Sequence, residues 1–346
     1  MSAAPAGSLR FIEQSAPLPG QTVQVAPGIH WLRMPLPMSL DHINLWLLQD
    51  QQGFVLVDTG MATDAARAAW MALEHSRLRQ YPLRLIVLTH LHPDHAGLAA
   101  WLQQRFEVPV WSSCDTYEQL RILTREPTPA ELAGRVAQLV HHGLPQATAG
   151  QLAPMLRFDT YRTEVSGLPR IERFPVQDEV SHWGGRDWRW LATGGHAYGH
   201  LCLHSCEPQD ILVSGDQVLP SMSSNVSLNT MVDDPDPLGT FLGDLGRLAA
   251  LDHDTLVLPS HGQPFRGLAQ RAQELRQHHE RRLEKLITAC RTPLTAVETL
   301  PFLYRREHAG FQLYLALGEA LAHLEHLAAA GRLERIDDGV RRYLAL

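Results

Sequence analysis

The segment "VLTHLHPDHAG", residues 87–97, places four side chains that can bind metal ions within six positions, directly after an apolar run. The run at 83–89 is short and rich in branched residues, which predicts a buried strand. Two histidines two positions apart at a strand end can project to the same side, and Pro93 then forces a turn that directs the next pair elsewhere. Because one cation rarely takes four adjacent ligands, the cluster predicts two neighbouring metal ions. Its members are His90, His92, Asp94 and His95.

Three later segments also end apolar runs with a residue that can bind a metal ion, each in a loop that contains glycine. These segments are "GGHAYGH", "LVSGDQ" and "LPSHGQ", and they offer His200, Asp216 and His261. Imidazole and carboxylate are ligands that Zn²⁺ selects. The alternative is a set of surface histidines in a chain that holds 19, but motif and context agree on a metal site. We therefore predict two divalent ions, with Zn²⁺ favoured and Fe or Mn as alternatives.

Strand-like and helix-like segments alternate along the first third of the chain. Strand-like runs within 22–58 are followed by helical spacing at 62–79, a strand at 83–89, a helix at 95–106 and a strand at 108–113. This alternation predicts an α/β architecture with helices outside the sheet. Strand-like runs resume after residue 170, and a helix near 237–250 precedes the strand that ends at His261.

Two stretches depart from this alternation. Residues 115–170 hold helical patches broken by proline and glycine, which indicates an insertion that could enclose a small substrate. From residue 266 a long helix, a short helix, a third helix and two strands around Asp338–Gly339 follow in the order of a winged-helix module. We predict a catalytic unit at 1–265 and a smaller unit at 266–346. The smaller unit carries 13 basic and 10 acidic residues, whereas the larger one carries 17 and 27.

The motifs "THLHPDH", "GHAYGH", "SGDQ" and "PSHG", in this order, resemble the metallo-β-lactamase superfamily over about residues 22–265. The resemblance implies a four-layer αββα sandwich with a dinuclear site at its edge. It implies that one metal is held by His90, His92 and His200, that the other is held by Asp94, His95 and His261, and that Asp216 bridges them. "VDTG" at 57–60 matches a further family motif, and Asp58 is expected to hydrogen-bond a ligand histidine. An aspartate at the bridging position is similar to glyoxalase II, RNase Z-like nucleases and lactonases.

Further residues receive narrower expectations. Asp94 could orient a metal-bridging hydroxide and accept its proton, and Tyr198 either reaches a substrate oxygen or is an ordinary packed tyrosine. His196 is expected to be a turn or supporting residue instead of a ligand. Residues 221–230 follow Asp216 and are expected to line the pocket. Cys202, His204 and Cys206 are expected to be structural residues of a strand, with the cysteines buried. The pairs His141–His142 and His278–His279 are expected to be solvated residues of helices.

The ligand set predicts hydrolysis, because two close cations can share a hydroxide and polarise a substrate oxygen. We expect a small-molecule substrate, most of all an acyl thioester of the glyoxalase II or acyl-CoA kind. A metal-dependent phosphodiesterase or endoribonuclease is the alternative, which the winged-helix-like unit supports. A mononuclear-iron sulfur dioxygenase is a third reading, and a non-enzymatic binding protein is a fourth.

Composition and charge limit the kinds of binding partner and the cellular compartment that we expect for the protein. A net charge of −7 argues against a chain that coats nucleic acid by bulk charge, so nucleic acid is the less favoured partner. Four cysteines in 346 residues do not form a disulfide framework. The chain has no apolar run of 18 residues and does not open on a signal-like segment, so we expect a soluble, cytoplasmic protein without a membrane partner. The smaller unit leaves a homodimer open.

Overall fold

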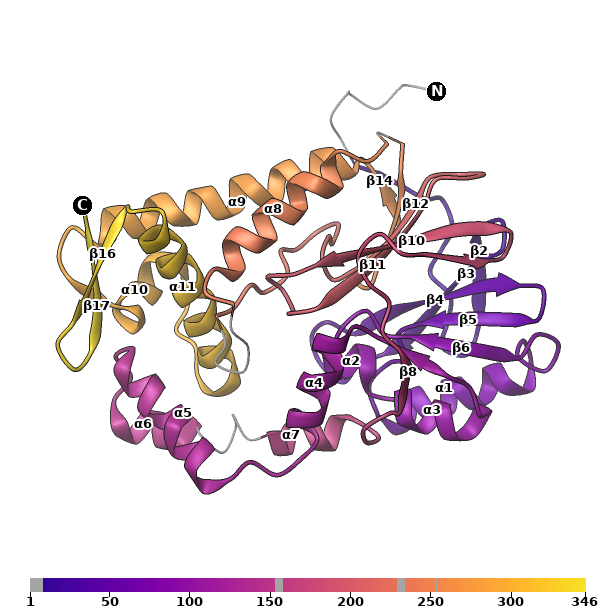
Figure 1. Ribbon diagram of the computed structural model, residues 1–346, viewed down its shortest axis with the longest axis horizontal. Coiled ribbons are helices and arrows are strands. Elements are labelled where there is room, and N and C mark those ends of the chain that lie inside the picture. Colours follow the sequence, from indigo (N-terminus) through magenta and orange to yellow (C-terminus); the bar gives the residue numbers. More distant parts are fainter. Residues whose placement is uncertain (1–8, 153–157, 229–233, 253) are drawn as a thin grey trace.

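Two seven-stranded sheets pack face to face in the computed structural model, which describes residues 9–152, 158–228, 234–252 and 254–346 (Figure 1). Within these residues the first sheet has the order β2-β3-β4-β5-β6-β7-β8 and the second has the order β1-β14-β13-β12-β11-β10-β9. The first is built from β2 (Thr22–Ala26), β3 (Ile29–Pro35), β4 (His42–Asp50), β5 (Gly53–Val57), β6 (Leu83–Val87), β7 (Val110–Trp111) and β8 (Ile171–Arg173). The second is built from β1 (Arg10–Phe11), β9 (Val180–Trp183), β10 (Arg186–Thr193), β11 (His200–Ser205), β12 (Ile211–Gly215), β13 (Leu256–Pro259) and β14 (Phe265–Arg266).

The strands are apolar on both faces because both faces are covered. Along β4, Leu45 and Leu47 join the cluster under the outer helices, whereas Trp46 and Leu48 join the cluster between the two sheets. This is the two-residue period of a strand, with each face buried against a different layer. Aromatic rings fill the space between the sheets, as in the stack of Trp31 on Trp46 at 6.2 Å between ring centroids.

Helices cover the outer face of each sheet. The helices α1 (Asp64–His75), α2 (Pro93–Ala96) and α3 (Ala99–Phe106) lie on the first sheet, and α8 (Pro237–Ala249) and α9 (Leu268–Ala289) lie on the second. The expected four-layer αββα sandwich is therefore confirmed. The single helix expected at 95–106 is divided at Gly97–Leu98, because the backbone N–H of Leu98 donates to the carbonyl of Gly60 at 2.9 Å instead of continuing the helix.

The helical insertion contacts two parts of the protein. It comprises α4 (Cys114–Leu123), α5 (Pro129–His141), α6 (Gln146–Leu152) and α7 (Phe158–Glu164). Leu120 of α4 and Tyr161 of α7 are buried in the cluster of the first sheet, and the Tyr161 hydroxyl donates to the carbonyl of Leu91 beside the histidine motif. Leu139 of α5 and Leu152 of α6 are buried instead among the C-terminal helices (Figure 1). Among the described residues of the insertion, it is thus the α4 and α7 part that approaches the candidate site.

The C-terminal elements follow the predicted order. After α9 come β15 (Leu294–Thr295), α10 (Ala296–Leu303), α11 (Gly310–Ala329), β16 (Leu333–Asp337) and β17 (Arg341–Ala345), and the strands form a sheet in the order β15-β17-β16. Arg266 still pairs with Arg10 in the second sheet, so this sheet extends one residue past the predicted boundary at 265. No helix in the described part of the chain is long and apolar enough to cross a bilayer.

One histidine pair is placed differently from the expectation. His278 is partly buried, but His279 is fully buried between α9 and α11, where its Nδ1 lies 3.1 Å from Nε2 of His323. The prediction that both histidines are solvated is therefore wrong for His279. On a helix with charge on most faces, the sequence does not mark which polar residue faces inward.

Candidate metal centre

The ends of parallel strands from both sheets meet at one edge of the sandwich. In the first sheet β5 and β6 run parallel, and Asp58 and the histidine motif follow them. In the second sheet β12 and β13 run parallel, and Asp216 and His261 follow them. Because parallel neighbours bring their carboxyl ends to the same edge, four separate segments deliver polar side chains to one place.

A first group of ligand atoms is formed by His90, His92, His196 and Asp216, one atom from each lying within 4.8 Å of the others. His90 Nε2 and His92 Nδ1 are 2.9 Å apart, as expected for two histidines that share one side of a strand end. His196 Nε2 lies 3.4 Å from Oδ2 of Asp216. Three imidazoles and one carboxylate oxygen thus converge.

A second group is formed by Asp94, His95 and His261. Nε2 of His261 is 3.3 Å and Nε2 of His95 is 3.6 Å from Oδ2 of Asp94. The other carboxylate oxygen of Asp216, Oδ1, lies 3.5 Å from each of these two nitrogens. Asp216 therefore presents one oxygen to each group.

Several of these atoms are buried without a hydrogen-bond partner among the described residues. They are His95 Nε2, His196 Nε2 and Asp216 Oδ1. A buried polar atom without a partner is costly, and proteins seldom leave three such atoms facing one another. Cations bound between them would satisfy all three, so the residues present fit a pair of divalent ions.

His200, which was expected to be a ligand, is not brought into either group. Its Nε2 accepts a hydrogen bond from the backbone N–H of Asp216 at 3.2 Å, and its Nδ1 lies 2.8 Å from Oγ1 of Thr193. Both ring nitrogens therefore have partners inside the protein. His196, which was expected to be a supporting residue, is in the first group instead. The two residues differ in their place in the fold, because His196 lies in the loop that follows β10, whereas His200 is the first residue of β11.

Asp58 supports the second group. Its Oδ2 lies 2.7 Å from Nδ1 of His95, which leaves Nε2 of that ring directed at the other ligands. Its Oδ1 accepts the backbone N–H of Thr89 at 2.8 Å. Asp58 has a left-handed backbone with φ of 61°, a conformation that costs energy for a residue other than glycine. The carboxylate contacts hold this conformation, in line with the expected hydrogen bond to a ligand histidine.

Burial keeps two imidazoles of the first group, those of His90 and His92, neutral. It is the main reason that the pKa of His90 lies well below its ordinary value and that the pKa of His92 falls to about 3. Neighbouring histidines lower both values further, whereas nearby carboxylates partly oppose the shift at His92. Neutral imidazole is the form that binds a metal ion, so these two rings need no deprotonation.

We expect metal binding to the second group to release protons. Burial opposes protonation of His95 and His261, but the carboxylates of Asp216 and Asp94 outweigh it, raising the pKa of His95 well above normal and that of His261 to about 10. Both rings therefore carry a proton near neutral pH and lose it when they bind a cation. Zn²⁺ titration calorimetry in buffers of different ionisation enthalpy should give about two protons released per chain. The proton released by His261 should be lost from the count as the pH rises through about 10, and no release near neutrality would contradict these protonation states.

The remaining candidates lie outside both groups. Tyr198 is 40% exposed and is held through its backbone carbonyl, which accepts from Gln119 Nε2 at 2.8 Å. Cys202 is buried as expected, but Cys206 is exposed, so the expectation of buried cysteines fails there. His204 Nε2 lies 3.1 Å from an oxygen of Asp210, while Cys206 Sγ is near its other ring nitrogen at 4.0 Å. One ligand atom from each of His204, Cys206 and Asp210 also lies within 4.8 Å of the others, so these residues form a third group, with Cys206 exposed, at the other end of β11 from His200.

Two further expectations concern helices and a loop. His142 is partly buried, and burial lowers its pKa to about 4, so its ring is less solvated than was expected. Asn225, in the loop after Asp216, accepts a hydrogen bond from His196 Nδ1 through its backbone carbonyl at 2.8 Å. A backbone contact leaves no residue-specific signal in the sequence. Residues 229–230 of that loop lie outside the described residues.

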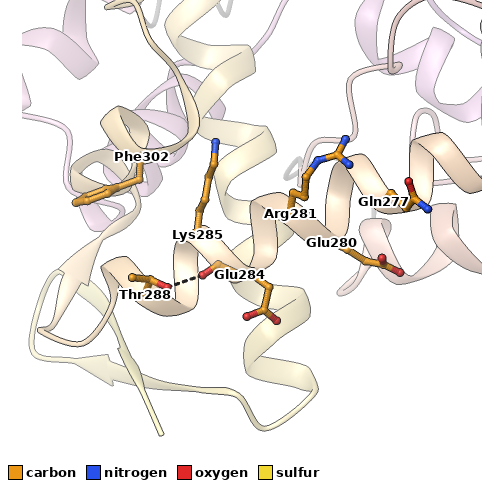
Figure 2. A pocket seen from close by; sticks show the side chains of 7 residues that line it. All are labelled: Gln277, Glu280, Arg281, Glu284, Lys285, Thr288 and Phe302. Atoms are coloured by element: carbon orange, nitrogen blue, oxygen red, sulfur yellow. Dashed lines mark hydrogen bonds between the residues drawn. The ribbon is translucent and has the colours of Figure 1, made fainter.

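A hollow of about 710 Å³ lies elsewhere, on the outer face of α9 and α10 (Figure 2). It is lined by Gln277, Glu280, Arg281, Glu284, Lys285, Thr288 and Phe302. Charges of both signs alternate along this face, and none of the seven residues belongs to either ligand group. The candidate chemistry therefore lies at the histidine cluster and not in this hollow.

Comparisons with known proteins agree with the fold and the motifs. Residues 38–261 match the family model described as the metallo-beta-lactamase superfamily, and residues 283–346 match the metallo-beta-lactamase-like C-terminal domain. A beta-lactamase domain protein from Burkholderia ambifaria is 38% identical, with a TM-score of 0.86, over 98% of this chain and 97% of that one. The chain belongs to the metallo-beta-lactamase superfamily, as its motifs indicated.

Two named relatives are more distant. A probable metallo-hydrolase of Bacillus subtilis is 25% identical over 311 residues, which is 86% of this chain and 91% of the relative. An acyl-coenzyme A thioesterase of Gallus gallus is 28% identical over 207 residues, which is 55% of this chain and 63% of the relative. Membership of this superfamily, the metallo-hydrolase relative and the His/Asp cluster make the chain a metal-dependent hydrolase.

Proposed function

We propose that the protein is a dinuclear metal-dependent hydrolase that cleaves small acyl thioesters. The observation that carries the dinuclear assignment is the carboxylate of Asp216, whose two oxygens each face a different group of ligand atoms. A single ion would leave one of these groups without a cation. This speaks against the mononuclear-iron dioxygenase.

The ligand assignment follows the geometry. One ion would be held by His90, His92 and His196, the other would be held by Asp94, His95 and His261, and Asp216 would contact both. Five imidazoles and two carboxylates favour Zn²⁺, with Fe or Mn as alternatives. When bound, such ions supply an activated water molecule and polarise the substrate oxygen.

Three side chains near the ligands assist the proposed reaction in different ways. Asp94 is the partly exposed carboxylate of the second group, with 18% of its side chain accessible, so it is the residue placed to accept a proton from attacking water. Asp58 orients His95 from the buried side. Tyr198, two residues from His196 and exposed, is proposed to contact the substrate.

Exposed apolar side chains that are close in sequence to the ligands support a small acyl substrate. Met222 and Tyr198 are 42% and 40% exposed, and each lies within six residues of a ligand. Met38 is 48% exposed, in the loop that leads to His42, whose carbonyl accepts from Nδ1 of His261. Apolar side chains beside a polar site are typical of small-molecule pockets. The distant acyl-coenzyme A thioesterase adds support for this class.

The test compares substrate classes with one Zn²⁺-saturated preparation of the full chain. We expect acyl thioesters to be hydrolysed faster than lactones, penicillins, bis-p-nitrophenyl phosphate and RNA. For RNA the reason is that the catalytic unit is acidic and repels an anionic polymer. The control is His92→Ala, which should lose all genuine activity. Faster cleavage of single-stranded RNA, suppressed by salt, would overturn the thioester assignment in favour of the phosphodiesterase.

A further inference from the structure

Residues 223–228, named here the strap, lie between the metal centre and the helices α9 and α11. On the side of the metal centre, the Ser224 hydroxyl donates to the backbone carbonyl of Asp216. Nδ1 of His196 donates to the carbonyl of Asn225 at 2.8 Å, which leaves Nε2 of that ring free for a cation. Partners of this kind fix the orientation of a ligand histidine. The strap thus forms hydrogen bonds with the ring of one proposed ligand, His196, and with the backbone of another, Asp216.

On the other side, the strap is packed against the C-terminal helices. Val226 is fully buried in the cluster that contains Ala272 of α9 and Ala322 of α11. The backbone N–H of Leu228 donates to the carbonyl of Gly318 in α11 at 3.0 Å. Any shift of α11 against the sandwich therefore acts on the strap.

A buried hydrogen-bond chain joins the strap to both helices. Nδ1 of His323 can only donate to the carbonyl of Glu319, at 2.7 Å, so its Nε2 accepts from Nδ1–H of His279 at 3.1 Å. This fixes Nε2 of His279 as an acceptor, and the Ser223 hydroxyl, 3.2 Å away, donates to it. Both rings are neutral, because burial lowers the pKa of His279 to about 2 and that of His323 to about 4. The two rings thus have fixed donor and acceptor roles, and the Ser223 hydroxyl hydrogen is shared between Nε2 of His279 and the carbonyl of Ser224, 3.3 Å from its oxygen.

We propose that the strap is a positioning element through which the C-terminal unit sets the metal affinity of the centre, with His279 and His323 as positioning residues. The inference rests on the proposed function, because it needs metal ions at His196 and Asp216. It gives the C-terminal unit a role at the site, although no proposed ligand lies beyond His261.

Gly318 provides a way to move the strap without touching a ligand. A Cβ added at this position would lie 2.9 Å from Oγ and 3.0 Å from Cβ of Ser227, so Ser227 of the strap has to move by a few tenths of an ångström. Gly243 is the matched control, since it also lies within a helix but has no atom within 4 Å of an added Cβ. Alanine favours a helix over glycine by about 1 kcal/mol at either position. The two substitutions therefore differ in the contact with the strap.

The experiment measures Zn²⁺ affinity of the metal-free full chain by competition with a chromophoric chelator, together with thermal unfolding. We expect Gly318→Ala to weaken the affinity by about 10–100-fold, as for other residues that orient ligands, and Gly243→Ala to leave it unchanged. Adding Ser227→Gly to the Gly318→Ala chain removes the two crowded atoms and should restore most of the affinity. The Ser227→Gly chain alone completes the cycle.

The outcomes separate this inference from the proposed function. If the wild-type chain binds no Zn²⁺, the proposed function and the inference both fail. If it binds two ions and Gly318→Ala binds them as tightly, or if Ser227→Gly restores nothing, only the inference fails. If Gly318→Ala does not fold, Ser223→Ala takes its place. That variant removes the donor to His279, and unchanged Zn²⁺ affinity would then overturn the inference.

Discussion

The Asp216→Ala variant is expected to lose at least one of two bound metal ions and to fall in kcat/KM by about 10²–10³-fold or more. Asp216 is the one carboxylate with an oxygen 3.4–3.5 Å from ligand nitrogens of both groups, so its loss removes the negative charge between two cations. Metal content by elemental analysis and turnover of an acyl thioester measure the two effects. The wild-type chain should hold two ions.

Asp58→Ala is the comparison for this variant. Asp58 contacts His95 through Nδ1 and no cation, so its removal should cost about 10–100-fold and leave the ion count at two under metal supplementation. Asp216→Ala protein that keeps both ions and wild-type activity would contradict the assignment of Asp216 to both groups.

Replacing His196 is expected to have a larger effect than replacing His200. His196→Ala removes a ring nitrogen from the first group, so this variant should retain about one ion per chain. His200→Ala removes only the acceptor for the backbone N–H of Asp216 and a partner of Thr193, so we expect two ions bound about 10–100-fold more weakly. Elemental analysis and chelator competition measure both variants.

The reverse result for the two variants would also decide which histidine is the ligand. One ion in His200→Ala and two tightly bound ions in His196→Ala would return the ligand role to His200. Thermal unfolding of both metal-free variants is the control. His200 is fully buried in β11, so a loss of folded structure there would otherwise imitate the loss of a ligand.

The architecture could be predicted from the sequence because burial on both faces marks the strands as continuous apolar runs. Runs such as "HINLWLLQD" and "GFVLVDTG" became β4 and β5, and the residues after strand ends became the candidate centre. The division of the helix near Gly97 could not be predicted, because it depends on the hydrogen bond from Leu98 to the carbonyl of Gly60. That is a tertiary contact and not a local preference.

Within the site, the sequence could locate the loops but could not choose between two histidines in one of them. Both His196 and His200 belong to "GGHAYGH", and both are near Asp216. The choice depends on which ring nitrogens already have partners: Asn225 engages only one nitrogen of His196, whereas Thr193 and Asp216 engage both nitrogens of His200. Two of these partners are backbone groups, which every residue has, so no residue type signals them.

The division of the helical insertion has a consequence for how this chain can be shortened. Leu139 of α5 and Leu152 of α6 are buried against the same cluster as Leu286 and Leu324 of the C-terminal helices, although more than 130 residues separate them along the chain. A chain cut at Gly267 would leave those leucines in water, and a chain without the insertion would uncover the C-terminal helices. Neither α5–α6 nor the C-terminal helices can therefore be removed alone without exposing the other, and α9 has to stay because it covers the second sheet.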